Sequence, residues 1–153
     1  MREILFRAKA INRNKGYHRT KYKNGDWVYG LLTRLYDEKF ENLPAEMINE
    51  NGVSGIEIDH NTIGQFTGLT DKNGKKIFEG DIVEGHCHSQ WSHRLQRCVV
   101  EYDIGNFEAR HYVEQGGVMR YYSYKVLFSK DVVVIGNIHD NPELLKGATD
   151  ERN

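Results

Sequence analysis

Short stretches of alternating apolar and polar residues run along this chain, and turn-forming residues separate them. The stretch DWVYGLL, residues 26–32, has the apolar and aromatic content of a β-strand. In GIEID, residues 55–59, Ile56 and Ile58 fall on the same face of an extended strand. These two stretches predict β-structure in the N-terminal part of the chain.

The segment between those strands, residues 42–55, is acidic and rich in turn residues. Pro44 is suited to the first position of a helix, so it predicts a short helical turn through Met47 and Ile48. The pair Asn51-Gly52 predicts a hairpin-like turn into the following strand.

Two turn signals lie close together in TDKNGKKIFEGDIV, residues 70–83. The pair Asn73-Gly74 predicts a type I′ hairpin turn, in which both central residues have positive φ. After a short strand, Gly80-Asp81 predicts a bulge or sharp bend before the β-pattern resumes. We expect Asp81 to cap backbone N–H groups or to face solvent, because Asp is a turn residue for local reasons.

The C-terminal half repeats the β-pattern at short intervals and predicts a small barrel. Its expected strands are CVVEYD (98–103), NFEARHYV (106–113), YYSYKVLF (121–128) and VVVIGNI (132–138), the last buried on both faces. The sequence DNPELLKG then predicts one helical turn, with Asn141 as N-cap, Pro142 at the first position and Gly147 as the stop.

A polar, His-rich insert, EGHCHSQWSHRLQR (84–97), interrupts the barrel pattern. It is longer than ordinary connections, which predicts a functional or interface loop.

The composition is that of a globular protein: of 153 residues, 39% are apolar and 28% are charged. No apolar run approaches the about 18 residues that a membrane span needs. Charged residues interrupt the first segment, MREILFRAKAIN, so it does not predict a secretory signal. We therefore expect a cytoplasmic protein, in which Cys87 and Cys98 are free thiols.

The net charge of −1 conceals two oppositely charged blocks. Residues 1–40 carry ten Lys/Arg against four Asp/Glu, whereas residues 41–60 carry five acidic residues and no Lys or Arg. Such blocks suggest either a basic arm for an acidic partner or complementary ends within an oligomer.

A basic, aromatic-rich N-terminal segment is the candidate nucleic-acid contact. Cations neutralise phosphates, and aromatic rings stack on bases. The candidate contacts are Arg7, Arg13, Lys15, Arg19, Lys21 and Lys23. The alternative is a solvated surface with its charge neutralised by the acidic block, which the pI near 6.7 favours.

Exposed aromatic residues are the candidate protein interface. Aromatic side chains supply large contact areas on binding surfaces, and the candidates here are Trp91, Tyr121, Tyr122 and Tyr124. Unpaired strand edges also favour self-pairing, so a homo-oligomer is expected.

The His/Cys-rich loop is a weaker candidate for metal binding or thiol chemistry. Its donors are His86, Cys87, His88, His93 and Cys98, whose spacing differs from that of familiar zinc sites. A nucleophilic Cys87 or Cys98 beside His93 or His111 would need a lowered thiol pKa and a positioned base. We expect no cofactor and no enzymatic activity.

Three motifs together resemble the YopX family of phage and prophage proteins: WVYG, TIGQFTGLTDKNGKKIFEGDIV and VIGNIHDNPELL. The resemblance runs from about residue 3 to 145. It implies an SH3-type barrel in the C-terminal half, and it carries over no catalytic residue.

We therefore predict a mainly β fold, in which an N-terminal β region (1–60) packs on an SH3-like barrel (61–145) followed by a polar tail (146–153). The predicted function is that of a cytoplasmic phage accessory protein that acts by binding a protein partner or itself. Nucleic-acid binding is the alternative, and a thiol or metal enzyme is third.

Overall fold

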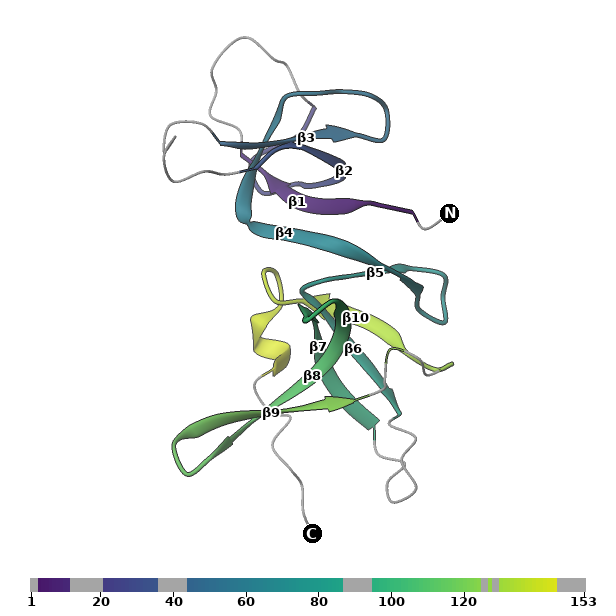
Figure 1. Cartoon of the computed structure of the whole chain (residues 1–153), viewed down its shortest axis with the longest axis vertical. Coiled ribbons are helices and arrows are strands. Elements are labelled where there is room, and N and C mark those ends of the chain that lie inside the picture. Colours follow the sequence, from purple (N-terminus) through teal and green to yellow (C-terminus); the bar gives the residue numbers. More distant parts are fainter. Residues whose placement is uncertain are drawn as a thin grey trace. The chain divides into compact units, whose positions relative to one another are not determined.

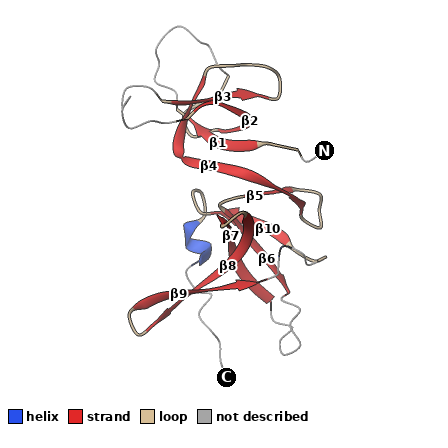
Figure 2. Ribbon diagram, in the orientation of Figure 1, coloured by secondary structure: helices blue, strands red, loops and turns tan. Residues whose placement is uncertain are grey.

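The computed structural model describes residues 3–11, 21–35, 44–86, 95–124, 127 and 130–145. These residues form two five-stranded sheets in which each strand pairing with a defined register is antiparallel, together with one short 3₁₀ helix, η3 (Pro142–Leu145). Strands account for most of the ribbon (Figure 2). The predicted mainly β fold class is confirmed.

The chain divides into two compact units, Met1–Phe66 and Thr67–Asn153. The domain limits expected at residues 60 and 145 stay predictions. Each unit has a hydrophobic core of its own.

The first unit is built on a ring of four strands (Figure 1): β1 (Phe6–Ala10), β2 (Trp27–Arg34), β3 (Ala45–Asn49) and β4 (Ile56–Thr70). Neighbouring strands pair in chain order, and β1 also pairs with β4, which closes the ring. Alanine, methionine and β-branched aliphatic side chains fill its core: Ala8, Ala10, Val28, Ala45, Met47, Ile56 and Ile58. Because each of the four strands pairs on both sides, none leaves an open edge.

The segment after Pro44 is a strand, so the predicted helical turn is wrong. Ala45, Met47 and Asn49 point into the unit with period two, as β3 lies between β2 and β4. Pairing on both sides therefore overrides the local helical signal. Gly30 on β2 permits the close approach of β3, since a Cβ there would lie 1.9 Å from the carbonyl oxygen of Ile48.

A side chain organises the turn predicted at Asn51-Gly52. Gly52 has a positive φ of 78°, and the Asn49 Oδ1 accepts hydrogen bonds from the backbone N–H groups of Asn51 (3.0 Å) and Val53 (2.9 Å).

In the second sheet four strands form a meander, and the last strand returns beside the first (Figure 1). The order is β10 (Val133–Asn137), β6 (Asp81–His86), β7 (Leu95–Asp103), β8 (Asn106–Gln115) and β9 (Val118–Tyr124). The short β5 (Lys76–Phe78) pairs with β4. The core of this unit includes Ile77, Val83, Cys98, Val100, Ala109, Leu127, Val132 and Val134.

The turn at residues 71–75 differs from the predicted type I′ form. Gly74 has a φ of 81°, but Asn73 does not have positive φ. Asp71 supplies the stabilisation instead: its Oδ1 accepts from the N–H groups of Asn73 (2.8 Å) and Lys75 (2.9 Å), and its Oδ2 accepts from Val134 (3.1 Å). One buried carboxylate thus joins this turn to β10.

The bend at Gly80-Asp81 forms as predicted. Gly80 has a φ of 79°, and the buried Asp81 Oδ2 accepts a hydrogen bond from the backbone N–H of Phe78 at 2.7 Å. Asp81 is therefore the expected backbone cap.

The polar insert expected over residues 84–97 is shorter than predicted. Strands β6 and β7 continue into it, pairing Glu84 with Arg97 and His86 with Leu95. Residues 87–94 lie outside the described part of the chain.

The C-terminal helical turn is confirmed as η3, and its predicted stop at Gly147 lies outside the described residues. Strand β10 is half-buried rather than buried on both faces.

Candidate functional site

The hairpin of β8 and β9 extends beyond the other strands of its sheet (Figure 1). Strand β7 pairs with β8 only along Asn106–Arg110, whereas β8 and β9 stay paired to the hairpin turn. Residues 111–115 and 118–122 therefore form a two-stranded ribbon, which we call the arm. Among the described residues, the arm has no third strand beside it.

Two glycines make the turn at the tip of the arm. Gly116 and Gly117 have φ values of 61° and 77°. Positive φ at both central residues is the type I′ geometry, whose twist matches that of the flanking strands. This turn was not predicted from the sequence, although a Gly-Gly pair between two alternating stretches is a recognised hairpin signal.

Strand β9 is exposed on both faces. Every residue from Val118 to Ser123 is exposed, including the large side chains of Met119 (62%), Tyr121 (51%) and Tyr122 (45%). Edge strands are usually protected by lysines, prolines or bulges. Strand β9 has one charged residue, Arg120, and no proline, and it pairs with β8 in unbroken register over seven residues.

Arg110, at the base of the arm, is the centre of an ion-pair network. Its guanidinium donates hydrogen bonds to the carboxylates of Glu101 (3.1 Å), Glu108 (3.1 Å) and Asp103, and the Arg110 side chain is only 11% exposed. Burial alone would lower its pKa, but the hydrogen bonds to Asp103 and Glu108 outweigh burial and raise it, so Arg110 is charged.

This network holds a pair of tyrosines on one face of the hairpin. The guanidinium carbon of Arg110 lies 4.4 Å from the centroid of the Tyr121 ring, and Tyr121 lies opposite Tyr112 with ring centroids 5.9 Å apart. Tyr112 donates a 2.7 Å hydrogen bond to Glu101. Burial and this hydrogen bond raise the pKa of Tyr112 to about 12, so its hydroxyl stays protonated and donates.

Glu108 completes the same face. Its carboxylate accepts hydrogen bonds from Ser123 on β9 (2.6 Å) and from Arg110, which lower the pKa of Glu108 below its ordinary value. The base of the arm is therefore tied by charged groups, whereas its outer half exposes Val118 and Met119 opposite Gln115 and Glu114.

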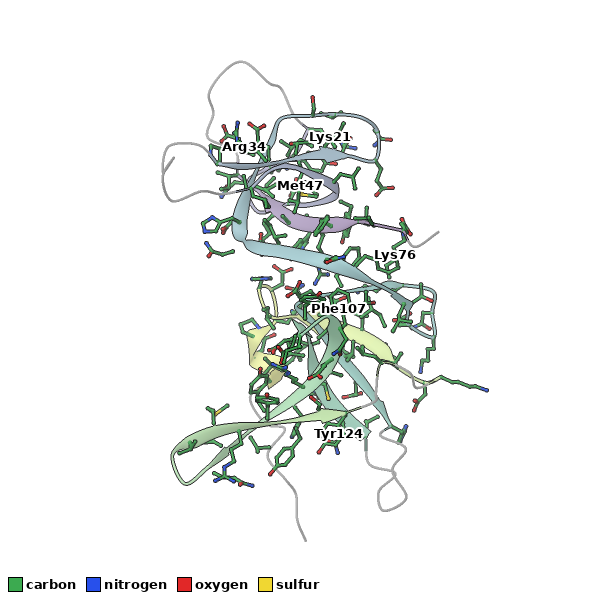
Figure 3. The ribbon with its side chains drawn as sticks, viewed as in Figure 1. Lys21, Arg34, Met47, Lys76, Phe107 and Tyr124 are labelled. Atoms are coloured by element: carbon green, nitrogen blue, oxygen red, sulfur yellow. The ribbon has the colours of Figure 1, made fainter. Side chains whose placement is uncertain are left out.

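The opposite face of the hairpin joins the core. The His111 ring nitrogen Nδ1 lies 2.9 Å from the carbonyl oxygen of Arg97, and because a carbonyl only accepts, Nδ1 carries the proton. The ring of His111 meets that of Tyr124 edge-on at 6.1 Å, and Tyr124 packs against the core (Figure 3).

The aromatic interface candidates thus divide into three kinds. Tyr121 and Tyr122 are exposed on the arm, Tyr124 is half-buried at its base, and Trp91 lies outside the described residues. The arm also contains Val118 and Met119, which sequence reasoning missed. The alternation in VMRYYSY predicts a strand, but only the sheet order shows that this strand lies at an edge.

Among the described residues, the basic N-terminal candidates do not gather on one face. Arg7 is 5% exposed and lies over the Trp27 ring at 4.7 Å, and Lys21 lies over Tyr22 at 5.6 Å. Lys21 and Lys23 are exposed, whereas Arg13, Lys15 and Arg19 lie outside the described residues.

Acidic residues lie beside several cations of this unit. Lys9 stands opposite Asp59 in the pairing of β1 with β4, and Arg34 forms an ion pair with Glu46 at 2.6 Å. Neutralisation of the basic segment as a whole by the acidic block stays a prediction.

Among the described residues, the proposed metal donors do not come together. Cys98 is buried in the core, and His86 pairs with Asp131. Cys87, His88 and His93 lie outside the described residues. Within the described part, no three His, Cys, Asp or Glu residues form a group that could hold a metal ion.

No helix among the described residues has the length and apolarity needed to cross a membrane.

Fold and site together define a two-unit β-protein whose second sheet ends in an exposed hairpin. The family model described as YopX protein matches residues 5–146, and the chain belongs to the YopX family. The resemblance found in its motifs is thereby confirmed. The comparison with curated proteins gives no match.

A solved structure with a similar fold is the crystal structure of protein EF1440 from Enterococcus faecalis. It is 29% identical to this chain with a TM-score of 0.50, and the match covers 94% of this chain and 98% of that one.

Proposed function

We propose that this protein is a non-enzymatic binding and assembly module, and that the arm is its contact surface. The observation that carries the proposal is the run of exposed residues from Val118 to Ser123 on an edge strand. We place this activity in the cytoplasm of a phage-bearing cell, in line with the phage origin that the motif resemblance implies.

Physical reasoning supports the arm as a contact surface in two ways. A two-stranded ribbon is at best marginally stable when no third layer covers it, so a partner that covers the arm also stabilises it. Tyrosine and methionine are enriched at protein interfaces, where they supply large contact areas. The arm displays Met119, Tyr121 and Tyr122 together.

The ion-pair network at the base adds preorganisation. Tyr121 is held between Arg110 and Tyr112 before any partner arrives. A side chain that is already ordered loses less conformational entropy on binding, which favours affinity.

Nucleic-acid binding is the weaker candidate. Acidic residues neighbour the cations of the first unit, as the Lys9 and Asp59 register and the Arg34–Glu46 pair show. The pI near 6.7 is also low for a dedicated nucleic-acid binder.

Site-specific photo-crosslinking in cells tests the proposal. A photoreactive benzoylphenylalanine replaces Met119 on the arm, and the matched control carries it at Ile104, which is 94% exposed in the β7–β8 turn of the same unit. We expect a discrete protein adduct at position 119, absent at position 104 and suppressed by excess unlabelled wild-type protein. A chain that forms no adduct at 119, or equal adducts at both positions, would contradict the proposal.

A further inference from the structure

We propose that the partner covering the arm is a second copy of this chain, with β9 of one copy pairing antiparallel with β9 of the other. This inference rests on the proposed function of the arm and names its partner. Pairing of the two edges would join two five-stranded sheets of order β10-β6-β7-β8-β9 into one continuous sheet.

The length and regularity of β9 make it suitable for self-pairing. The strand runs from Val118 to Tyr124 without a bulge in its pairing with β8. Its middle residue is Tyr121, so a twofold axis at Tyr121 is the arrangement that pairs all seven residues of the strand. Tyr121 then lies opposite Tyr121 of the second copy.

The position of the charged residue in β9 favours the same register. Arg120 is the only charged residue of β9, and the Tyr121-centred pairing places it opposite Tyr122 of the second copy. A guanidinium over a tyrosine ring is a favourable cation–π contact. A register centred on Arg120 would instead place two guanidinium groups directly opposite each other, which is unfavourable.

The rows of side chains across the joined sheets are complementary as well. On the face held by Arg110, Tyr112 and Tyr121 of one copy continue into Tyr121 and Tyr112 of the other, following the observed Tyr112–Tyr121 register. On the opposite face, Val118 meets Tyr124 of the second copy. These two rows pair aromatic or apolar groups, and no row places like charges opposite each other.

A disulfide trap in purified protein tests the register. Residues directly opposite in an antiparallel pair have Cα atoms about 4.5 or 5.5 Å apart, within the range that a disulfide spans. We expect Tyr121→Cys, in a Cys87→Ser background, to form a covalent dimer under mild oxidation. The matched control is Ile104→Cys in the same background, at an exposed turn position in the same unit. The remaining Cys98 is buried.

A second pair of variants checks the alignment. Met119 is expected opposite Ser123 of the second copy. Mixed Met119→Cys and Ser123→Cys chains should therefore cross-link faster than either variant alone. Equal rates in the mixture and in the separate variants would overturn the proposed register.

Association in solution provides an independent measurement. The wild type should be dimeric by light scattering, and Tyr121→Glu, which opposes two carboxylates at the axis, should weaken dimerisation by at least about tenfold. A cooperative thermal transition of the dissociated Tyr121→Glu chain would show that it still folds.

Different results would overturn the arm as a contact surface and the second copy as its partner. A wild type that stays monomeric at high concentration, with Tyr121→Cys no faster to cross-link than Ile104→Cys, overturns the second copy as partner. A photo-crosslink from position 119 to a different protein would then still uphold the arm as a binding surface. Loss of that crosslink too would remove both.

Discussion

The two sheets of this protein solve the problem of strand edges in opposite ways. In the first unit, the pairing of β1 with β4 closes the ring, so each of the strands β1 to β4 is paired on both sides. Among the described residues of the second unit, the sheet ends at β9, whose outer residues are exposed on both faces. Closure pairs every strand of the ring on both sides, whereas the open edge at β9 is the surface on which we propose that a partner pairs.

Two methionines make this contrast measurable, and they give the largest expected effect. Met47 on β3 is fully buried, whereas Met119 on β9 is 62% exposed. Met47→Ala should lower the free energy of unfolding by about 2–5 kcal/mol, because it removes buried methylene groups and leaves a cavity. Met119→Ala should change it by less than about 0.5 kcal/mol in the monomer.

Urea unfolding of the two variants at low protein concentration measures both values. A Met119→Ala variant as destabilised as Met47→Ala would show that the arm is part of a core, and the contrast between the sheets would fail.

The Asp71 carboxylate joins the turn at residues 71–75 to β10 in the second unit. Replacing this carboxylate is expected to give the second largest effect. Asp71→Asn keeps the shape of the side chain but replaces the carboxylate that accepts N–H bonds from Asn73, Lys75 and Val134. We expect the free energy of unfolding to fall by about 1–3 kcal/mol, since hydrogen bonds to charged groups are strong and a buried donor is left poorly paired.

The same carboxylate sets a pH dependence. Burial would raise the pKa of Asp71, but the N–H bonds from Val134, Lys75 and Asn73 lower it below its ordinary value of 3.8. A lowered pKa in the folded state means that the stabilisation is present above pH 3.8 and is lost as the pH falls through the folded-state pKa. Wild type should therefore lose its advantage over Asp71→Asn in that acidic range, as unfolding curves between pH 2 and 6 would show.

The hairpin turns described on either side of β8 give a smaller effect of opposite sign. Gly116 and Gly117 adopt positive φ at no steric cost, but the β7–β8 turn places Ile104 at a φ of 41°. A β-branched residue is strained there, whereas Asn tolerates this region. Ile104→Asn should therefore raise the free energy of unfolding by about 1 kcal/mol.

Thermal unfolding measures this gain, with Ile104→Val as the control that retains β-branching. Equal transition temperatures for the two variants would argue against strain at Ile104.

The smallest effect is expected in the basic segment. Lys21 and Lys23 are exposed, so the double variant Lys21→Gln, Lys23→Gln should change the free energy of unfolding by less than about 0.5 kcal/mol. Fluorescence anisotropy with labelled oligonucleotides at about 50 and about 200 mM salt should detect no salt-sensitive binding for wild type or variant. Binding that weakens steeply with salt and with this variant would instead place nucleic acid among the partners.

Local signals predicted much of the fold. The alternation in DWVYGLL and NFEARHYV corresponds to β2 and β8, and Pro142 begins η3 as expected. Asp81 caps Phe78 because a short carboxylate readily reaches a backbone N–H three residues away. These features depend on neighbours in sequence, so the sequence is sufficient to predict them.

The predictions from sequence are wrong where contacts with a distant segment decide the local conformation. Pro44 signals a helical turn, but β2 and β4 pair with the following residues and extend them. Asn73-Gly74 signals a type I′ turn, but the Asp71 carboxylate stabilises a different one and binds Val134, 63 residues away.

The sequence by itself determined the β-class of this protein, its family membership and the faces on which its side chains alternate, because period-two patterning and turn chemistry are local. Only the tertiary structure decided that β1 meets β4 to close one sheet and that the tyrosines of β9 lie on an open edge of the other. Strand pairing joins residues that are far apart in the chain, and an alternating pattern does not state which strand will lie beside it.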